Sequence, residues 1–342
     1  MADARGEDMT NRYWRLDARP QGNDFAKALS LVEAELGEPQ NGEIVIDNRM
    51  LSMDAGTRMW MTDRTDGYQP PLELGVPMSG LVIGPVIASR ADGFAAGDWV
   101  RAFGTWSDYS IVDATLSGAM MLDTSVSDMR DHFGPLGMNG WTALWGLEKT
   151  GATKAGDKVL VSAAAGATGL LACQIAQLLG GEAYGIAGGE TKCAILERDY
   201  GVTKAFDYRA GDMTEKLAAI DGGIDVYFDN IGGEILEAVL ANMALYGRVA
   251  VCGLIAEYAN GRRGCPANFD QVLMKRLRIE GFFSPDFMQH GDELTARLRQ
   301  WVDAGELSLP YDVTLGLANT LTAYEKLFTG GNIGKVIVEL SK

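Results

Sequence analysis

The stretch VLVSAAAGATGLLACQIAQLLGG, residues 159–181, decides the fold of this chain. Its side chains are all small, apolar or uncharged, and it is long enough to cross a bilayer as one helix. A membrane helix would poorly tolerate its glycine cluster and the polar Gln174 and Gln177. The glycines instead predict three elements: a buried strand that ends near residue 163, a sharp turn, and a helix over 168–180.

The turn between this strand and helix has the spacing of a dinucleotide-binding fingerprint. Ala164, Gly166 and Gly169 occupy the three glycine positions of the pattern GxGxxG, with alanine at the first. Gly166 lets the backbone approach a diphosphate, Gly169 lets the helix pack on the strand, and free N–H groups at the helix start attract anionic oxygens. Because the turn follows a strand and opens a helix, it predicts a dinucleotide site. The alternative is a tight turn without a ligand.

The chain on both sides of this turn predicts a doubly wound sheet. From residue 157 to about 283, β-rich segments alternate with helical ones, which is typical of parallel βαβ units. The expected strands are 158–164, 182–188, 204–208, 224–230, 247–253 and 277–283, and the expected helices are 168–180, 190–200 and 233–243.

Short strands with glycine and proline turns predict a different, β-rich and barrel-like domain before residue 120. Strands are expected at 42–48, at 80–89 and within 97–113, and a strand at 334–341 is expected to return to this domain after a helix at 291–304. We therefore predict an α/β chain with a nucleotide-binding domain inserted into a β-rich domain. The predicted boundaries are 126–304 for the first and 1–125 plus 305–342 for the second.

The composition excludes several classes of function. The 342 residues carry a formal net charge of −16, which repels nucleic acid and anionic lipid, so neither is expected as a partner. The four cysteines, at 173, 193, 252 and 265, lack CxxC spacing, and the two histidines lie far apart, so no metal site is expected. The thiols suit a reducing compartment and the N-terminus has no apolar signal core, which favours the cytoplasm.

The end of the second expected strand bears on which dinucleotide binds. An NAD site usually has an acidic residue there for the ribose hydroxyls. Here Gly188 and Gly189 occupy the position and Lys192 follows one helical turn later, which favours the 2′-phosphate of NADPH. Glu190 is an argument for NAD, and Lys192 as a solvated surface lysine is an equally good interpretation.

Several motifs together resemble the zinc-free branch of the medium-chain dehydrogenase/reductase superfamily, and within it the leukotriene dehydrogenase, prostaglandin reductase and alkenal double-bond reductase group. The resemblance runs from about residue 11 to the end. The matching stretches are LSMDAGTRMWM (51–61), VPMSGLVIGPVIAS (76–89), LGMNGWTALWGL (136–147), VLVSAAAGATG (159–169), GIDVYFDNIGGEIL (223–236), GRVAVCGLIAEYAN (247–260), LRIEGFF (277–283) and GGNIGKVIVEL (330–340).

The resemblance implies a GroES-like catalytic domain around a Rossmann domain, with NADPH reducing the carbon–carbon double bond of α,β-unsaturated ketones and aldehydes. Lys192 and Tyr208 would hold the 2′-phosphate, and Asn230 and Asn332 the nicotinamide ribose and nearby phosphate. The full set of expected cofactor residues is Ala164, Gly166, Ala167, Thr168, Gly169, Gly188, Lys192, Tyr208, Asn230, Cys252 and Asn332.

Tyr258 is the expected catalytic residue, because the resemblance points it toward the substrate carbonyl. Hydride addition to the β-carbon builds negative charge on that oxygen, and a hydroxyl donor stabilises it without a metal. The alternative is a tyrosine that only shapes the pocket. The relatives commonly have Pro-Tyr where this chain has Ala55 and Gly56, which reshapes the substrate pocket. Its expected lining is Met53, Arg58, Trp60, Tyr109 and Met138, with Trp106 nearby; for these residues, ordinary core packing is the alternative.

Two other functions stay open at this point. One is an NADPH-dependent quinone reductase, and the other is a non-catalytic cofactor-binding protein of the same fold. A homodimer is expected through the apolar edge strand within 277–283, because an unpaired strand edge can pair across a two-fold axis.

Overall fold

The computed structural model describes residues 9–65, 70–258 and 265–340, and the chain divides into two compact units. The described parts of residues 1–129, 313–331 and 336–342 form unit 1, and residues 130–312 and 332–335 belong to unit 2. The chain therefore leaves unit 1, builds unit 2, and returns to unit 1 twice near its end.

The described part of unit 2 contains a six-stranded sheet in the order β11-β10-β9-β12-β13-β14, in which all neighbouring strands are parallel. This confirms the predicted doubly wound sheet. The chain order reverses between β9 and β12, so the carboxyl ends of these two strands form the switch point where such sheets bind ligands. The strands are β9 (Lys158–Val161), β10 (Glu182–Ala187), β11 (Lys204–Asp207), β12 (Ile224–Asp229), β13 (Met243–Val251) and β14 (Arg278–Gly281).

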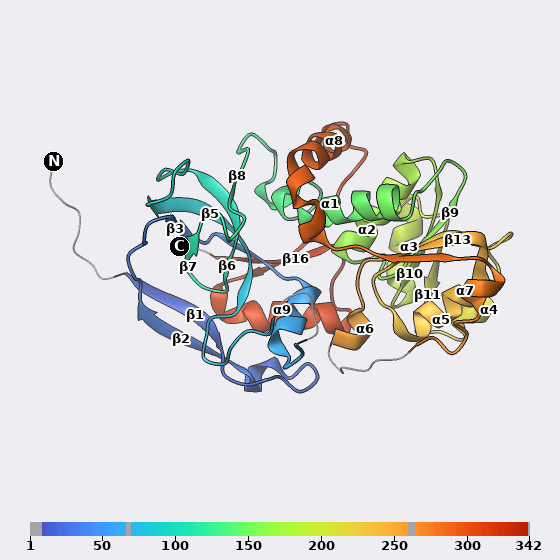
Figure 1. The fold of residues 1–342 in the computed structure, drawn as a ribbon, viewed down its shortest axis with the longest axis horizontal. Helices are drawn as coiled ribbons and strands as arrows, with labels where there is room; N and C mark the ends of the chain where they lie inside the picture. Colours follow the sequence, from blue (N-terminus) through green and yellow to red (C-terminus); the bar gives the residue numbers. More distant parts are fainter. Residues whose placement is uncertain (1–8, 66–69, 259–264, 341–342) are drawn as a thin grey trace. The chain divides into compact units, whose positions relative to one another are not determined.

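Helices cover both faces of this sheet, which explains why the central strands are almost wholly apolar and buried. α1, α2 and α3 pack one against the next, while α4, α5 and α7 form a second group, seen together in Figure 1. The helices are α1 (Met138–Trp145), α2 (Ala167–Leu178), α3 (Glu190–Tyr200), α4 (Met213–Leu217), α5 (Gly233–Asn242), α6 (Ile255–Tyr258), α7 (Gln271–Met274) and α8 (Gly291–Asp303), with the π-helix η4 (Gly146–Thr150) and the 3-10 helices η3 (Met129–His132) and η5 (Ser284–His290).

Unit 1 is antiparallel and β-rich, as predicted. Its larger sheet has the order β15-β16-β4-β5-β3-β7, with β6 between β5 and β8, and a separate hairpin joins β1 to β2. The strands are β1 (Thr10–Leu16), β2 (Leu29–Glu35), β3 (Glu43–Asp47), β4 (Met50–Ser52), β5 (Ser79–Ser89), β6 (Trp99–Thr105), β7 (Tyr109–Asp113), β8 (Met120–Met121), β15 (Tyr311–Leu315) and β16 (Lys335–Glu339).

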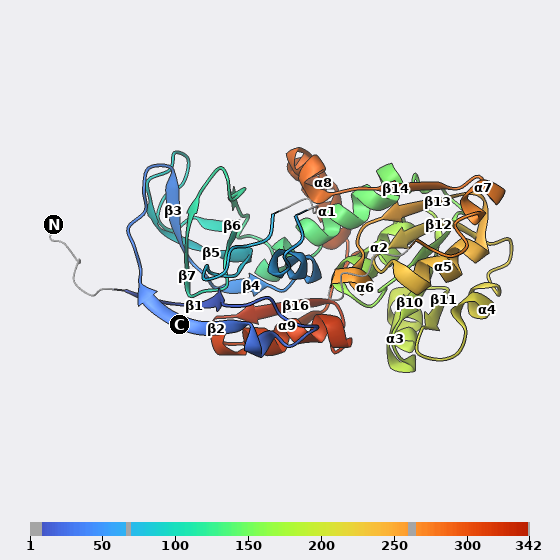
Figure 2. The ribbon, with the colours of Figure 1, turned by 60° about the horizontal axis from the view of Figure 1, so that its bottom comes forward.

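The last strand returns to unit 1, as expected from the sequence. β16 pairs antiparallel with β4, with Ile337 opposite Ser52. Figure 2 shows β16 and α9, coloured red, beside the blue N-terminal strands. Unit 1 also contains α9 (Thr320–Thr329) and the 3-10 helices η1 (Phe25–Lys27), η2 (Ala55–Met61) and η6 (Leu317–Asn319).

The core of unit 1 is built largely from aromatic side chains that join the two ends of the chain. Tyr324 of α9 lies 4.8 Å from Phe25 and 4.9 Å from Trp106, measured between ring centroids. The indole of Trp14 donates a 2.9 Å hydrogen bond to the carbonyl of Leu317. Because early and late residues share one core, unit 1 cannot be completed until the whole of unit 2 has been synthesised. No helix within the described ranges combines the length and apolar character needed to traverse a bilayer.

Candidate functional site

The glycine turn joins β9 to α2 at the switch point of the sheet. A Cβ atom on Gly169 would lie 2.2 Å from the carbonyl oxygen of Ala163, so the start of α2 approaches the turn more closely than any side chain allows. Gly166 donates a 2.9 Å hydrogen bond to the same carbonyl and caps the helix. The first N–H groups of a helix have no partner inside it, so this half-buried start presents donors to a ligand.

Ala164, which replaces the first glycine of the fingerprint, is fully buried. Its nitrogen donates a 2.9 Å hydrogen bond to the carbonyl of Ile186 on β10. A Cβ on Gly185 would come within 2.9 Å of the methyl group of Ala164. The methyl group of Ala164 therefore lies against β10, in space that glycine at position 185 leaves open.

A segment from the end of the chain lies against this turn. Gly334 pairs with Gly166 as a parallel β-bridge, and its nitrogen donates a 2.8 Å hydrogen bond to the carbonyl of Ala165. The side chain of Asn332 is buried and donates a 3.0 Å hydrogen bond to the carbonyl of Gly334. The structure therefore places Asn332 within the same local cluster as the turn.

Thr168, in the first turn of α2, is held from a second helix. The side-chain amide of Asn139 on α1 lies 2.9 Å from its hydroxyl oxygen. Met138, which precedes Asn139, opens α1 and is half-buried. The contact joins the two helices that flank the switch point.

The loop after β12 is held by a buried carboxylate that the sequence analysis did not single out. One oxygen of Asp229 accepts hydrogen bonds from the Tyr227 hydroxyl at 2.8 Å and from the nitrogens of Ile231 and Gly232 at 2.9 Å each. Its other oxygen is buried without a partner in the described structure. Burial raises the pKa of Asp229, and the hydrogen bonds oppose that shift.

Asn230 follows this carboxylate and spans the switch point. Its side-chain amide donates a 2.7 Å hydrogen bond to the carbonyl of Ser162, and its backbone nitrogen donates to the Ser162 hydroxyl at 2.9 Å. The backbones that follow β9 and β12 are therefore fixed to each other through one residue. Asn230 remains half-buried at this edge.

The loop after β13 is hydrogen-bonded to the segment that follows β12. The nitrogens of Cys252 and Gly253 donate hydrogen bonds of 2.8 and 3.0 Å to the carbonyl of Asp229. Burial raises the pKa of the Cys252 thiol to about 12, so it stays protonated at neutral pH. The hydroxyl oxygen of Tyr258, at the end of α6, accepts a 3.2 Å hydrogen bond from the nitrogen of Leu254. This contact folds the tyrosine back over its own loop.

A third cluster surrounds Gly188 at the end of β10. A Cβ on Gly188 would lie 2.8 Å from the ring of Tyr208 and 3.0 Å from the Nε atom of Arg209. Lys192, half-buried on the first turn of α3, has its pKa lowered by burial and by the charge of Arg209. Arg209 was missed by the sequence analysis, although it directly follows Tyr208. The cluster combines two cations, a phenol and a bare backbone, which suits a phosphate.

The residues expected to line the substrate pocket from unit 1 lie in or beside its interior. Met53 and Trp60 are buried in the core. Arg58 is also buried and donates hydrogen bonds to the carbonyls of Pro20 and Gly22 at 2.9 and 3.1 Å. Tyr109 is half-buried at the start of β7, and Trp106 is fully buried against Tyr324. These contacts give the residues a packing role; their part in a pocket stays a prediction.

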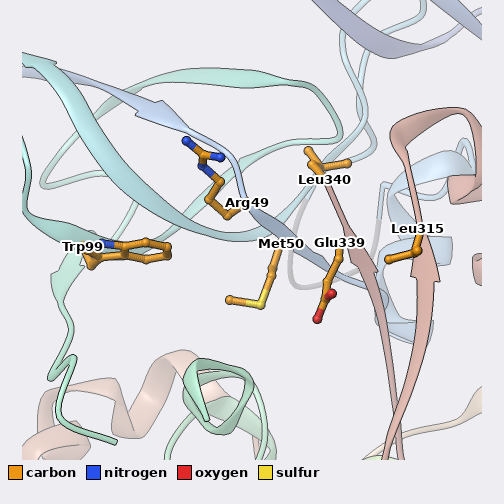
Figure 3. Close-up of a pocket in the computed structure, with 6 residues that line it drawn as sticks. All are labelled: Arg49, Met50, Trp99, Leu315, Glu339 and Leu340. Carbon is orange, nitrogen blue, oxygen red and sulfur yellow. The ribbon is translucent and has the colours of Figure 1, made fainter. Parts of the chain in front are cut away.

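A pocket of about 360 Å³ lies within unit 1, at the surface formed by β4, β6 and the end of β16 (Figure 3). Its lining is Arg49, Met50, Trp99, Leu315, Glu339 and Leu340, none of which is an expected site residue. Among the described residues, no group of three or more His, Cys, Asp or Glu side chains has an arrangement that could hold a metal ion.

Comparisons with known proteins match nearly the whole chain. Residues 12–120 match the family described as "N-terminal domain of oxidoreductase", and residues 167–300 match the family described as "Zinc-binding dehydrogenase". The "NADPH-dependent curcumin reductase" of Escherichia coli strain K12 is 32% identical over 97% of each chain. The "2-alkenal reductase (NADP(+)-dependent)" of Nicotiana tabacum is 34% identical over 94% of each.

A solved structure has the same fold over a similar length. CurA from Vibrio vulnificus in complex with NADPH superposes with a TM-score of 0.90 and 33% sequence identity, covering 97% of this chain and 99% of that one. These relatives, together with "Prostaglandin reductase 1" of Mus musculus, which is 32% identical over 96% of this chain and 98% of its own, belong to the group that the sequence resemblance indicated. The chain therefore belongs to the zinc-free branch of the medium-chain dehydrogenase/reductase superfamily.

Proposed function

We propose that this protein is an NADPH-dependent reductase of the carbon–carbon double bond in α,β-unsaturated ketones and aldehydes. The observation that carries the proposal is the pairing of the bare glycine turn at the switch point with the cationic cluster around Gly188. A diphosphate suits the first and a 2′-phosphate the second, so the two anionic groups of one NADPH molecule are both matched. The similarity to NADPH-dependent curcumin and alkenal reductases supports the same assignment.

We assign the cofactor contacts to the residues around this edge of the sheet. The turn from Ala164 to Gly169 would bind the diphosphate through its backbone, with the Thr168 hydroxyl beside it. Asn230, Cys252 and Asn332 would hold the nicotinamide half, and Gly188, Lys192 and Tyr208 the 2′-phosphate. When bound, NADPH supplies the hydride that the double bond accepts at its β-carbon.

Tyr258 is the residue that we assign to the substrate. Negative charge develops on the carbonyl oxygen as the double bond is reduced, and a phenol that donates a hydrogen bond to this oxygen lowers the barrier. The 3.2 Å bond from Leu254 fixes the hydroxyl oxygen of Tyr258, so the donor is held in place before substrate arrives. Met53, Arg58, Trp60, Tyr109 and Met138 are proposed to shape the space for the substrate.

The decisive experiment is a screen of cofactor oxidation with enals, aryl enones and quinones, using NADPH and NADH in parallel. We expect NADPH to be oxidised fastest with an enal or enone. Faster oxidation with quinones would assign a quinone reductase, and tight NADPH binding without turnover on any acceptor would assign a non-catalytic protein. A preference for NADH would contradict the proposed role of the cluster around Gly188.

We also propose that the protein forms a homodimer through β14. This strand is an edge of the sheet of unit 2, so one side of its backbone has no strand partner in the described chain. Exposed apolar side chains lie near its start, where the nitrogen of Tyr246 donates a 2.8 Å hydrogen bond to the carbonyl of Lys275; they are Leu245, Tyr246, Leu273 and Met274. A second copy of the chain would cover both features.

Sedimentation velocity tests this proposal. We expect a dimer for the wild type and a monomer for Leu273→Asp, because a buried unpaired carboxylate is costly at an interface. Leu116→Asp is the matched control, since Leu116 is 87% exposed but lies in unit 1. A monomeric wild type would rule the interface out.

A cytoplasmic location is proposed as well, because the four cysteines are free thiols.

A further inference from the structure

An acidic residue occupies the cationic cluster around Gly188. One carboxylate oxygen of Asp207, the last residue of β11, accepts two backbone hydrogen bonds: from the nitrogen of Gly189 at 2.8 Å and from that of Arg209 at 2.9 Å. Gly189 follows β10 and Arg209 follows β11. The single carboxylate therefore ties together the two loops that leave neighbouring strands.

Tyr208 and Arg209 lie in the second of these loops, and the first leads into α3, which carries Lys192. Gly189 caps α3, so its position sets where Lys192 lies one turn later. The nitrogen of Tyr208 donates a 3.1 Å hydrogen bond to the carbonyl of Ala187, which places the phenol over Gly188. Gly189 itself has a φ of +99°, a conformation that other residues adopt only with strain.

The charges of the cluster call for an anion. The ammonium of Lys192 makes no hydrogen bond or ion pair with any described residue, and Arg209 is close enough to lower the pKa of Lys192. Two neighbouring like charges repel each other, and an anionic ligand between or beside them lowers this repulsion. The carboxylate of Asp207 offsets part of this positive charge: its pKa is lowered by the hydrogen bonds that one of its oxygens accepts from two backbone nitrogens, and also by the nearby charges of Lys216 and Arg209.

We infer that Asp207 is a positioning residue that builds the 2′-phosphate site, and that Arg209 is a second cation, beside Lys192, that selects NADPH over NADH. The inference rests on the proposed function for the identity of the anion, and deepens it by adding two residues. Asp207 would not touch the phosphate. It would hold Gly189 and Arg209 so that the cations and the phenol meet around Gly188.

The positioning role of Asp207 predicts the opposite effect on NADPH affinity from the one that charge repulsion alone predicts. An acid that merely stood near a phosphate would weaken NADPH binding, and its removal by any substitution would tighten it. An acid that holds the loops strengthens binding, and an isosteric amide can replace it, because the amide oxygen of asparagine accepts the same two N–H hydrogen bonds. Alanine cannot.

The experiment measures dissociation constants of NADPH, NADH and adenosine 2′-monophosphate by fluorescence or calorimetric titration. For Asp207→Ala we expect NADPH to bind about 10-fold more weakly, whereas Asp207→Asn should stay within about 3-fold of wild type, as fits the loss or retention of the two backbone hydrogen bonds. Arg209→Gln should weaken NADPH by about 5- to 10-fold. NADH should change little in all three variants.

Asp212→Ala is the matched control, because Asp212 lies in the same loop and its carboxylate caps α4 through the nitrogen of Glu215 at 3.1 Å. It should leave the ratio of NADPH to NADH affinity unchanged. Arg209→Gln alters an exposed side chain, so it tests the second cation even if Asp207→Ala folds poorly.

Three results would overturn the inference: an unchanged ratio in Asp207→Ala and Arg209→Gln, tighter NADPH binding in both Asp207 variants, or equal losses in Asp207→Ala and Asp207→Asn. If the wild type binds adenosine 2′-monophosphate and the variants change the affinities as expected, but no enone is reduced, the inference stands and the reductase activity is refuted.

Discussion

The nitrogen of Gly334 donates a 2.8 Å hydrogen bond to the carbonyl of Ala165. This bond holds the segment just before β16 against the turn that follows β9. Gly334 has a φ of +71°, and a Cβ added to it would lie 2.0 Å from the carbonyl oxygen of Pro310. Both the backbone angle and the lack of space require glycine at this position.

Gly334→Ala is therefore expected to destabilise the fold and loosen the cofactor turn. We expect a loss of about 2–4 kcal/mol in the free energy of unfolding, from a clash with backbone added to left-handed strain. Gly305→Ala is the control, because Gly305 has a φ of +73° but nothing within 4 Å of the added Cβ, so it should cost only about 1 kcal/mol. Urea unfolding measures both, and equal losses would contradict the role of Pro310.

Tyr258→Phe tests the donor assigned to the substrate carbonyl. The substitution keeps the ring and removes the hydroxyl, so turnover of a good enone should fall by about 2- to 10-fold, the contribution of a single hydrogen bond. The affinity for NADPH should not change. Turnover equal to that of wild type would restrict Tyr258 to shaping the pocket.

The buried carboxylate of Asp229 predicts a pH dependence of stability. Burial raises its pKa in the folded chain, whereas in the unfolded chain it titrates near 3.9. At a pH between these two pKa values, Asp229 holds a proton in the native state that it has released in the unfolded chain. Its contribution to stability is therefore fully present below about pH 3.9 and declines as the pH rises toward the folded-state pKa.

Asp229→Asn removes this titration. The unfolding free energy of the variant minus that of wild type should increase as the pH rises above about 4, and then level off above the folded-state pKa. Parallel urea titrations from pH 4 to pH 8 measure the difference. A difference that stays constant across this range would show that Asp229 keeps an ordinary pKa in the fold.

The four thiols should differ sharply in reactivity. Burial raises the pKa values of Cys173 and Cys252 to about 12, so on the order of one molecule in 10⁴ carries either thiolate at pH 8. Cys193 is buried and Cys265 is exposed. Labelling of the native protein with Ellman's reagent should therefore show one fast thiol, which Cys265→Ser abolishes. A fast phase that survives this substitution would place another cysteine at the surface.

Much of the architecture was predictable from the sequence because it depends on local patterns. The glycine turn, the alternation of strands and helices over unit 2, and the returning last strand were all found in this way. α9 was missed, although Leu321, Tyr324 and Phe328 have the spacing of one helical face. Gly330 at its end, with a φ of +69°, is a typical C-cap that could have marked it.

The candidate site was only partly predictable, because its supporting residues are identified by where their partners lie. The sequence predicts only that Asp229 and Asp207 lie near the ends of strands, within 224–230 and 204–208. Their carboxylates act on nitrogens two residues later, as with Ile231, or on a neighbouring strand's loop, as with Gly189. No spacing along the chain indicates a partner such as Gly189, which lies on the loop of a neighbouring strand.

The sequence by itself determined that a parallel sheet exists and that an exposed backbone turn follows its first strand, because periodicity and glycine placement act over a few residues. Only the tertiary structure decided which strand ends meet. Sheet order placed β12 beside β9 and β11 beside β10, and so brought Asn230 to Ser162 and Asp207 to Gly189. These pairings depend on packing between distant segments, which local sequence preference does not encode.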